Sequence, residues 1–119
     1  MTMNWLKPPI ELRRKYKDAE HRGKVRELPC LACKAEDLYQ IYPTLGHHKM
    51  GEGSGGKVSD LLMMPLCSLH HNGEFIRDED QDKLSTWSIH QSNLKDWEER
   101  WGTQDELIEQ TNKKIKNND

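Results

Sequence analysis

Large hydrophobic residues are scarce in this 119-residue chain, which has one phenylalanine and a mean hydropathy of -1.00. Leu, Ile, Val and Phe together fall below the roughly 20% under which a strongly charged chain tends to be disordered. The net charge is only -2, so this composition by itself does not predict disorder. Because 32% of the residues are charged, the core is expected to be thin, and a metal or a disulfide would help to stabilise it.

The sequence also lacks a long apolar segment and a signal peptide. No apolar run is longer than Leu61–Cys67, and Met1–Pro8 does not have the pattern of a secretory signal. Three cysteines cannot all pair within one chain, which indicates a reducing compartment where cysteine more often binds metal. We therefore expect a soluble cytoplasmic protein with no membrane contact, and a secreted disulfide scaffold is excluded.

The chain length and residue pattern predict a single α+β domain over residues 1–119. Its expected parts are an extended tail (1–9), a basic helix (10–28), a core with two strands (29–75) and C-terminal helices (76–116). The strands are expected over 38–45 and 61–66, on either side of a glycine-rich segment.

Two local signals define the C-terminal helices. Leu94, Trp97 and Trp101 follow helical spacing, and Gly102 stands where such a helix would end. Thr103 and Glu106 have the spacing of a capping box that begins another helix. The tryptophans are therefore expected in the core, although docking on a partner protein is the alternative.

Four residues have the spacing of a structural zinc site. Cys30 and Cys33 form a CxxC pair, and Cys67 and His70 form a CxxH pair further along the chain. Zinc prefers four tetrahedral sulfur or nitrogen ligands, which these pairs supply. The alternatives are a buried Cys67 with a surface His70, or a redox-active CxxC pair, which would normally lie in a thioredoxin-like βαβ unit.

Three further histidines are expected to meet beside this zinc site. His47 and His48 end the first expected strand, and His71 directly follows the zinc ligand His70. Clustered imidazoles that become charged repel one another, so such a group suits a bound cation or proton transfer. A second, catalytic metal site is the interpretation that we favour over a solvated loop.

The order of these motifs, with LGHHK, SDLLMMPLCSLHH and IHQ, resembles the HNH, or ββα-metal, endonucleases. It resembles more narrowly the phage recombination enhancement (Ref) nucleases, which cut DNA together with the RecA filament. The resemblance covers about Val25 to Leu107 and implies a small zinc-stapled ββα-metal domain.

The resemblance also implies roles for individual residues. His47 and His71 would bind the catalytic divalent metal, Mg²⁺ or another ion such as Mn²⁺, and His48 would be the general base. Asp60 stands nearest to the middle Asn of the family, and His90 matches a position that completes the metal site; a turn residue and a helix cap are the respective alternatives.

DNA as a substrate requires local positive charge, because the overall charge supplies none. The residues expected to contact phosphates lie in the basic helix and around the glycine-rich segment: Arg13, Arg14, Lys17, Arg22, Lys49 and Lys57. A solvated helix face is the alternative. Two other functions stay open at this point: a zinc module that binds DNA without cutting it, and an adaptor of a recombination complex.

Overall fold

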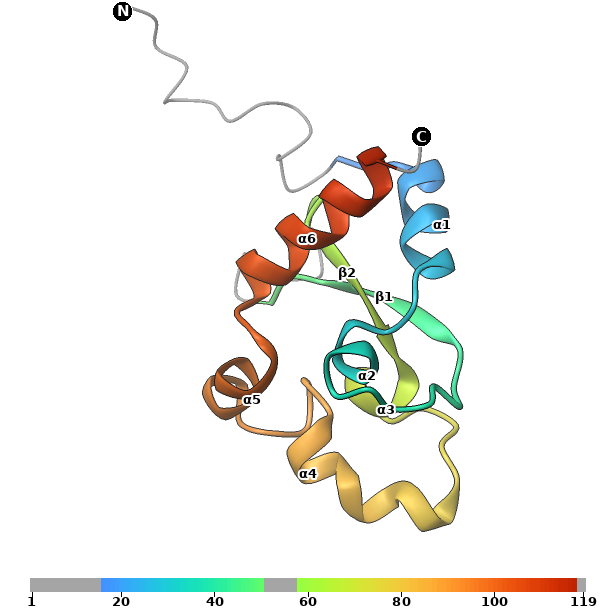
Figure 1. The fold of residues 1–119 in the computed structure, drawn as a ribbon, viewed down its shortest axis with the longest axis vertical. Coiled ribbons are helices and arrows are strands. Elements are labelled where there is room, and N and C mark those ends of the chain that lie inside the picture. Colours follow the sequence, from blue (N-terminus) through green and yellow to red (C-terminus); the bar gives the residue numbers. More distant parts are fainter. Residues whose placement is uncertain (1–15, 51–57, 118–119) are drawn as a thin grey trace, which may run out of the picture.

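An antiparallel hairpin lies at the centre of the structure, a computed structural model that describes residues 16–50 and 58–117. Its strands are β1 (Thr44–His48) and β2 (Met63–Cys67), with Thr44 opposite Cys67 and His48 opposite Met63. Figure 1 shows the hairpin between helices from both ends of the chain. The two-stranded sheet among helices confirms the expected α+β class.

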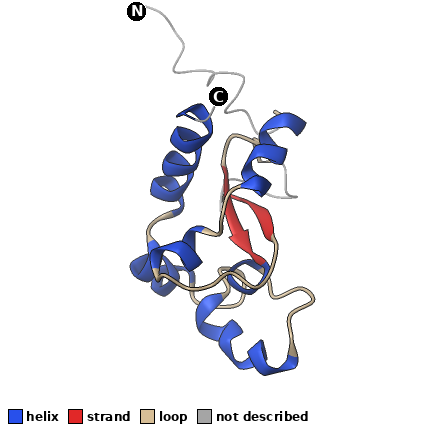
Figure 2. Ribbon diagram, turned by 45° about the vertical axis from the view of Figure 1, so that its right-hand side comes forward, coloured by secondary structure: helices blue, strands red, loops and turns tan. Residues whose placement is uncertain are grey.

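Short helices surround this hairpin (Figures 1 and 2). They are α1 (Ala19–Glu27), α2 (Leu31–Ala35), α3 (Ser68–His71), α4 (Leu84–Trp87), α5 (Leu94–Trp101) and α6 (Gln104–Asn117), with the 3-10 helix η3 (Asp78–Lys83) before α4. Helices α1 and α6 contact both the hairpin and each other, whereas α2 and α3 contact β2 near its end. Since α3 begins directly after β2, the hairpin and this helical turn form one continuous unit.

Two groups of apolar side chains hold the helices on the hairpin. In the larger group, Met64 and Leu66 of β2 lie in one cluster with Trp97, Trp101 and Leu107. Trp97 is 1% exposed and Trp101 8%, which confirms that both belong to the core. A smaller cluster joins Val25, Met63 and Ile115, and so connects α1 and α6 through β2.

The expected start of the basic helix is wrong. Residues 16–18 are not helical, and α1 begins at Ala19 rather than at residue 10. Asp18 has an extended backbone, and its carboxylate accepts a hydrogen bond from the N–H of His21 at 3.0 Å. An aspartate in this position is a strong N-cap, so it sets the beginning of the helix.

The strand expected over 38–45 is also wrong, because the first strand begins at Thr44 and includes both His47 and His48. Gln40 holds the preceding segment in an irregular conformation. Its side-chain amide donates to the carbonyl of Tyr42 and to the hydroxyl of Thr44, and its oxygen accepts from the N–H of Cys30. The second strand, expected over 61–66, runs from Met63 to Cys67, so it begins two residues later than expected.

The glycine-rich segment lies outside the described residues, as do Arg13, Arg14, Lys57 and the extended tail. Among the helices of residues 16–50 and 58–117, none combines the length and the hydrophobicity that crossing a bilayer requires.

The boundary between α5 and α6 follows the two local signals in the sequence. Gly102 ends α5 with φ 122° and ψ 158°, a backbone conformation that essentially only glycine adopts. Directly after it, the hydroxyl of Thr103 accepts from the N–H of Glu106 at 3.1 Å, and the Glu106 carboxylate accepts from the N–H of Thr103 at 3.1 Å. The capping box is therefore confirmed.

Replacing Gly102 and Gly23 by alanine should change stability in opposite directions. Gly102→Ala should lower the free energy of unfolding by about 1–3 kcal/mol, because a side chain at this φ and ψ is strained and its Cβ would lie 3.2 Å from Leu107. Gly23→Ala should raise it by up to about 1 kcal/mol, because alanine is the better helix former and nothing lies within 4 Å of the new Cβ. Urea unfolding of both variants measures this, and equal stabilities would contradict it.

Candidate metal centres

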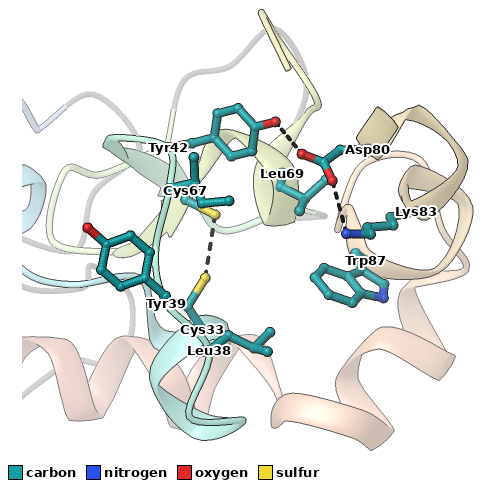
Figure 3. Close-up of a pocket in the computed structure, with 10 residues that line it drawn as sticks. Cys33, Leu38, Tyr39, Tyr42, Cys67, Leu69, Asp80, Lys83 and Trp87 are labelled. Atoms are coloured by element: carbon teal, nitrogen blue, oxygen red, sulfur yellow. Dashed lines mark hydrogen bonds and ion pairs between the residues drawn. The ribbon is translucent and has the colours of Figure 1, made fainter. Parts of the chain in front are cut away.

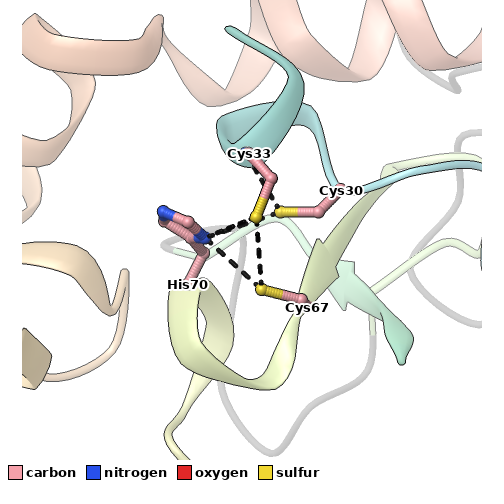
Figure 4. A group of neighbouring side chains, drawn as sticks. All are labelled: Cys30, Cys33, Cys67 and His70. Carbon is pink, nitrogen blue, oxygen red and sulfur yellow. Dashed lines mark hydrogen bonds between the residues drawn. The ribbon is translucent and has the colours of Figure 1, made fainter. Parts of the chain in front are cut away.

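The predicted zinc residues meet in one buried cluster that joins three segments of the chain. Cys30 and Cys33 lie at the start of α2, Cys67 ends β2, and His70 lies on α3 (Figure 4). The Nδ1 atom of His70 is 3.6, 3.5 and 3.4 Å from the sulfur atoms of Cys30, Cys33 and Cys67, and the sulfurs of Cys33 and Cys67 are 3.8 Å apart.

These four donors have the chemistry and the enclosure of a structural metal site. All four residues are buried, and their donor atoms lie within 4.8 Å of one another. Hydrogen bonds from Cys33 and Cys67 lower the pKa of Cys30, and the same contacts raise the pKa of Cys33 and of Cys67, so without a metal the cluster favours a single thiolate. Trp87 stacks on the His70 ring at 5.2 Å and Trp101 meets its edge at 5.1 Å. A Cys₃His set of this kind can hold a metal such as zinc.

A second group consists of histidines alone. His47 comes from β1, His71 from α3, and His90 from the segment between α4 and α5. Their ring centroids are 4.8 to 5.1 Å apart, and one potential ligand atom of each lies within 4.8 Å of the others. The structure thus brings together the three residues that the sequence predicts as ligands of a second metal.

Backbone hydrogen bonds place the segment of His90 beside α3. The N–H of Ile89 donates to the carbonyl of His70 at 2.8 Å, and the N–H of His90 donates to the carbonyl of His71 at 3.2 Å. The hydroxyl of Ser88 also donates to the carbonyl of His71, at 2.6 Å. The position of His90 therefore depends on α3, the helical turn that carries His71.

Desolvation favours the neutral form of these histidines, most strongly at the buried His47. Desolvation is the largest cause that lowers the pKa of His47 to about 3 and that of His71 to about 4, and neighbouring histidines lower both further. The pKa of His90 is lowered by the same desolvation. The Nδ1 atoms of His47 and His71 are buried without a hydrogen-bond partner, an unfavourable state that a bound cation would relieve. The donor set therefore fits a divalent metal.

His48 lies next to this group but faces another environment. Because side chains alternate along a strand, His48 points away from His47, and its Nε2 atom lies 2.8 Å from Oδ1 of Asp60. The side chain of His48 is 35% exposed, whereas that of Asp60 is 1% exposed. His48 is thus held from the protein side and open to solvent, as a proton acceptor requires.

Asp60 is fixed by the N-terminal segment. Its Oδ2 atom accepts a hydrogen bond from the N–H of Asp18 at 2.7 Å and an ion-pair contact from Arg22. Burial would raise the pKa of Asp60, but the hydrogen bonds from His48, Asp18 and Arg22 outweigh it, so the pKa lies below its usual range. Asp60 is therefore charged; it lies in a turn, as the alternative predicts, and its carboxylate also bonds to His48.

Sequence reasoning missed Gln104. Its side chain is buried at the start of α6, and Oε1 lies 3.1 Å from Nε2 of His47. The two residues are 57 positions apart in the chain, so no local pattern could have indicated the contact.

Two of the three described residues that are predicted to contact phosphates form ion pairs within the chain. Arg22 pairs with Asp60, Lys49 pairs with Asp105 at 2.7 Å, and Lys17 is exposed. Arg13, Arg14 and Lys57 are outside the described residues. Contact with DNA therefore stays a prediction for this set.

A hollow of about 170 Å³ borders the thiol cluster on a side that the histidine group does not line (Figure 3). Cys33 and Cys67 form part of its wall together with Tyr39 and Trp87. At its edge the hydroxyl of Tyr42 donates to Asp80 at 2.5 Å; this bond, followed by the contacts with Lys83 and Arg77, lowers the pKa of Asp80 to about 2.

Comparison with known proteins yields one relative of undetermined function. The chain is 30% identical over 101 residues to the uncharacterized protein YdfU of Escherichia coli K12. The alignment covers 81% of this chain and 22% of YdfU, so the chain spans about a fifth of the length of this relative. No protein-family profile matches the sequence. The candidate sites consequently rest on their own geometry.

We predict one zinc ion per chain in the thiol cluster. Cys67→Ser, or removal of the metal by a chelator, should unfold the protein, since structural zinc contributes on the order of 10 kcal/mol in small domains. Elemental analysis and circular dichroism measure both effects. Ser68→Ala, next to Cys67 but without a ligand atom in the cluster, should keep the zinc and the fold. Folded parent protein without zinc would disprove the site.

Proposed function

We propose that this protein is a metal-dependent DNA endonuclease of the HNH, or ββα-metal, type. One observation carries the proposal: three histidines with ligand atoms within 4.8 Å of one another, from the buried His47 to the exposed His90, lie near His48, whose imidazole bonds to the buried carboxylate of Asp60. The order of hairpin and helical turn, β1, β2 and α3, agrees with the ββα unit that the sequence resemblance implies.

His47, His71 and His90 would hold the catalytic metal. A divalent cation bound there would supply positive charge that stabilises the scissile phosphate and the leaving oxygen. Three imidazoles without a carboxylate suit Mn²⁺, Co²⁺, Ni²⁺ or Zn²⁺ by affinity, while Mg²⁺ prefers oxygen ligands. Activity in Mn²⁺ is therefore expected to exceed that in Mg²⁺.

His48 would act as the general base. Its Nε2–H donates to Asp60, which leaves Nδ1 as the atom that accepts a proton from the attacking water. The oxygen of that water then bonds to phosphorus, and the bond to the 3′ oxygen breaks. The Asp60 carboxylate stabilises the imidazolium that forms on His48 and keeps the ring in this tautomer.

Positive charge near the base supports a phosphodiester substrate. Lys49 directly follows His48, and Arg22 lies against the carboxylate that orients His48. The partly exposed Arg22 therefore lies near the base, whereas Lys49 pairs with Asp105 of α6, on the side of the strand that faces His47. A RecA filament as partner is proposed from the sequence resemblance alone.

The direct test is nicking of supercoiled plasmid in Mg²⁺, Mn²⁺, Co²⁺ and Ni²⁺, with and without a RecA filament. Cleavage in at least one metal supports the proposal. If the zinc-loaded protein binds DNA but cuts it under none of these conditions, the function is that of a zinc-stapled DNA-binding module.

Replacing His48 and His71 separately should produce different defects. His48→Ala should lower the cleavage rate by a factor on the order of 10² or more, as expected for a lost general base, with metal binding retained. His71→Ala removes a ligand, so its defect should appear as weaker metal binding that high metal concentration partly restores. Cleavage rates over a metal titration distinguish the two, and parental rates in both variants would overturn the proposal.

Two buried aspartates allow a matched test of the orienting role. Asp60→Asn should reduce the cleavage rate tenfold or more, because the carboxylate no longer stabilises and positions His48. Asp80→Asn changes a carboxylate that is equally buried and paired with basic residues, but that lies at the hollow of the thiol cluster. Its cleavage rate should equal that of the parent when both are measured below their unfolding temperatures. An unchanged rate in Asp60→Asn would remove Asp60 from the mechanism.

A further inference from the structure

Gln104 contacts the histidine site from α6, although no sequence signal indicates this contact. It is the first residue of α6 and is only 4% exposed. Its side-chain Oε1 lies 2.8 Å from the N–H of Met50 and 3.1 Å from Nε2 of His47, while its Nε2 lies 3.3 Å from the carbonyl of Met50. The N–H of Gln104 itself donates to the carboxylate of Glu98 at 2.9 Å.

These contacts determine which nitrogen of His47 carries the proton. The N–H of Met50 can only donate, and the carbonyl of Met50 can only accept, so the Gln104 amide must place its oxygen toward the Met50 N–H. The same oxygen faces Nε2 of His47, which therefore donates a hydrogen. Nδ1 is then the atom with the free lone pair, and it is also the buried atom of His47 without a partner.

We propose that Gln104 is the positioning residue of the histidine metal site: it fixes the ring and the tautomer of His47 so that Nδ1 is the ligand. Partners of this kind orient metal-bound histidines and raise their affinity. The inference depends on the metal-binding part of the proposed function and not on DNA cleavage. It also makes the N-terminus of α6 a part of the site, although α6 carries none of the metal ligands.

The test measures Co²⁺ binding to the zinc-loaded chain by calorimetry. Gln104→Leu should raise the Kd for Co²⁺ by about 10- to 100-fold, because the His47 ring loses its partner. Gln104→Glu keeps an oxygen that accepts from both His47 and Met50, but its second oxygen faces the Met50 carbonyl, so its Kd should lie between those of the parent and Gln104→Leu. Absence of a thiolate-to-cobalt absorption band confirms that Co²⁺ has not displaced the zinc.

Thr111→Val is the matched control. Thr111 is also a buried polar residue of α6, but its hydroxyl donates only within the helix, to the carbonyl of Leu107 at 2.8 Å. This variant should bind Co²⁺ as the parent does. Equal affinity of Gln104→Leu and the parent overturns the inference, and so does a parent that binds no Co²⁺ beyond its zinc.

A second measurement needs no variant, and it decides the matter if Gln104→Leu does not fold. Long-range ¹⁵N–¹H spectra of the zinc-loaded parent, before Co²⁺ is added, report which nitrogen of each neutral histidine is protonated. His47 should be protonated at Nε2, and protonation at Nδ1 overturns the inference. If the parent binds Co²⁺ with the expected variant pattern but does not cut DNA, the nuclease proposal fails and the role of Gln104 stands.

Discussion

The Cys₃His cluster is the constraint on which the rest of the structure depends. A two-stranded hairpin is only marginally stable by itself, and the cluster that joins this one to α1 and α6 has only three buried residues, Val25, Met63 and Ile115. The cluster brings together residues at α2, at the end of β2 and on α3, so it attaches α2 to the hairpin and to the helical turn that follows it. Because His70 and His71 are consecutive, closing the thiol cluster also determines where His71 lies. The backbone bonds from Ile89 and His90 to the same helical turn then add the third histidine.

Strand alternation separates the two chemical roles that neighbouring histidines would have. His47 lies inside with the other potential metal ligands, whereas His48 lies on the opposite face, beside Asp60 and partly in solvent. Helices from opposite ends of the chain support the two sides. Asp18, the N-cap of α1, and Arg22, within α1, bond to the Asp60 carboxylate beside His48. Gln104 of α6 bonds to His47. One five-residue strand thus connects a ligand position and a base position, each with its own supporting helix.

Features set by local rules could be predicted from the sequence, and so could the meeting of the metal-ligand motifs, whereas distant contacts outside any motif could not. The CxxC and CxxH pairs, the end of α5 at Gly102 and the capping box each depend on residues within a few positions. The sequence pattern predicts the first strand too early, because the β-favouring residues around Tyr39 and Ile41 do not reveal that Gln40 bonds to Cys30 and Thr44. The pairing of Arg22 with Asp60 spans 38 residues and that of His47 with Gln104 spans 57, so neither leaves a local pattern.

The histidine group carries an energetic cost that a bound cation would relieve. A buried polar atom without a hydrogen bond costs about 1–3 kcal/mol, and His47 and His71 each contribute one. A small domain has a total stability of only about 5–15 kcal/mol, so two such atoms are a large fraction of what a thin core can offset. Leucine or methionine at these positions would avoid the cost and add apolar contacts. A bound cation removes the cost by accepting both lone pairs, which makes metal binding the simplest physical reason for three imidazoles to share this site.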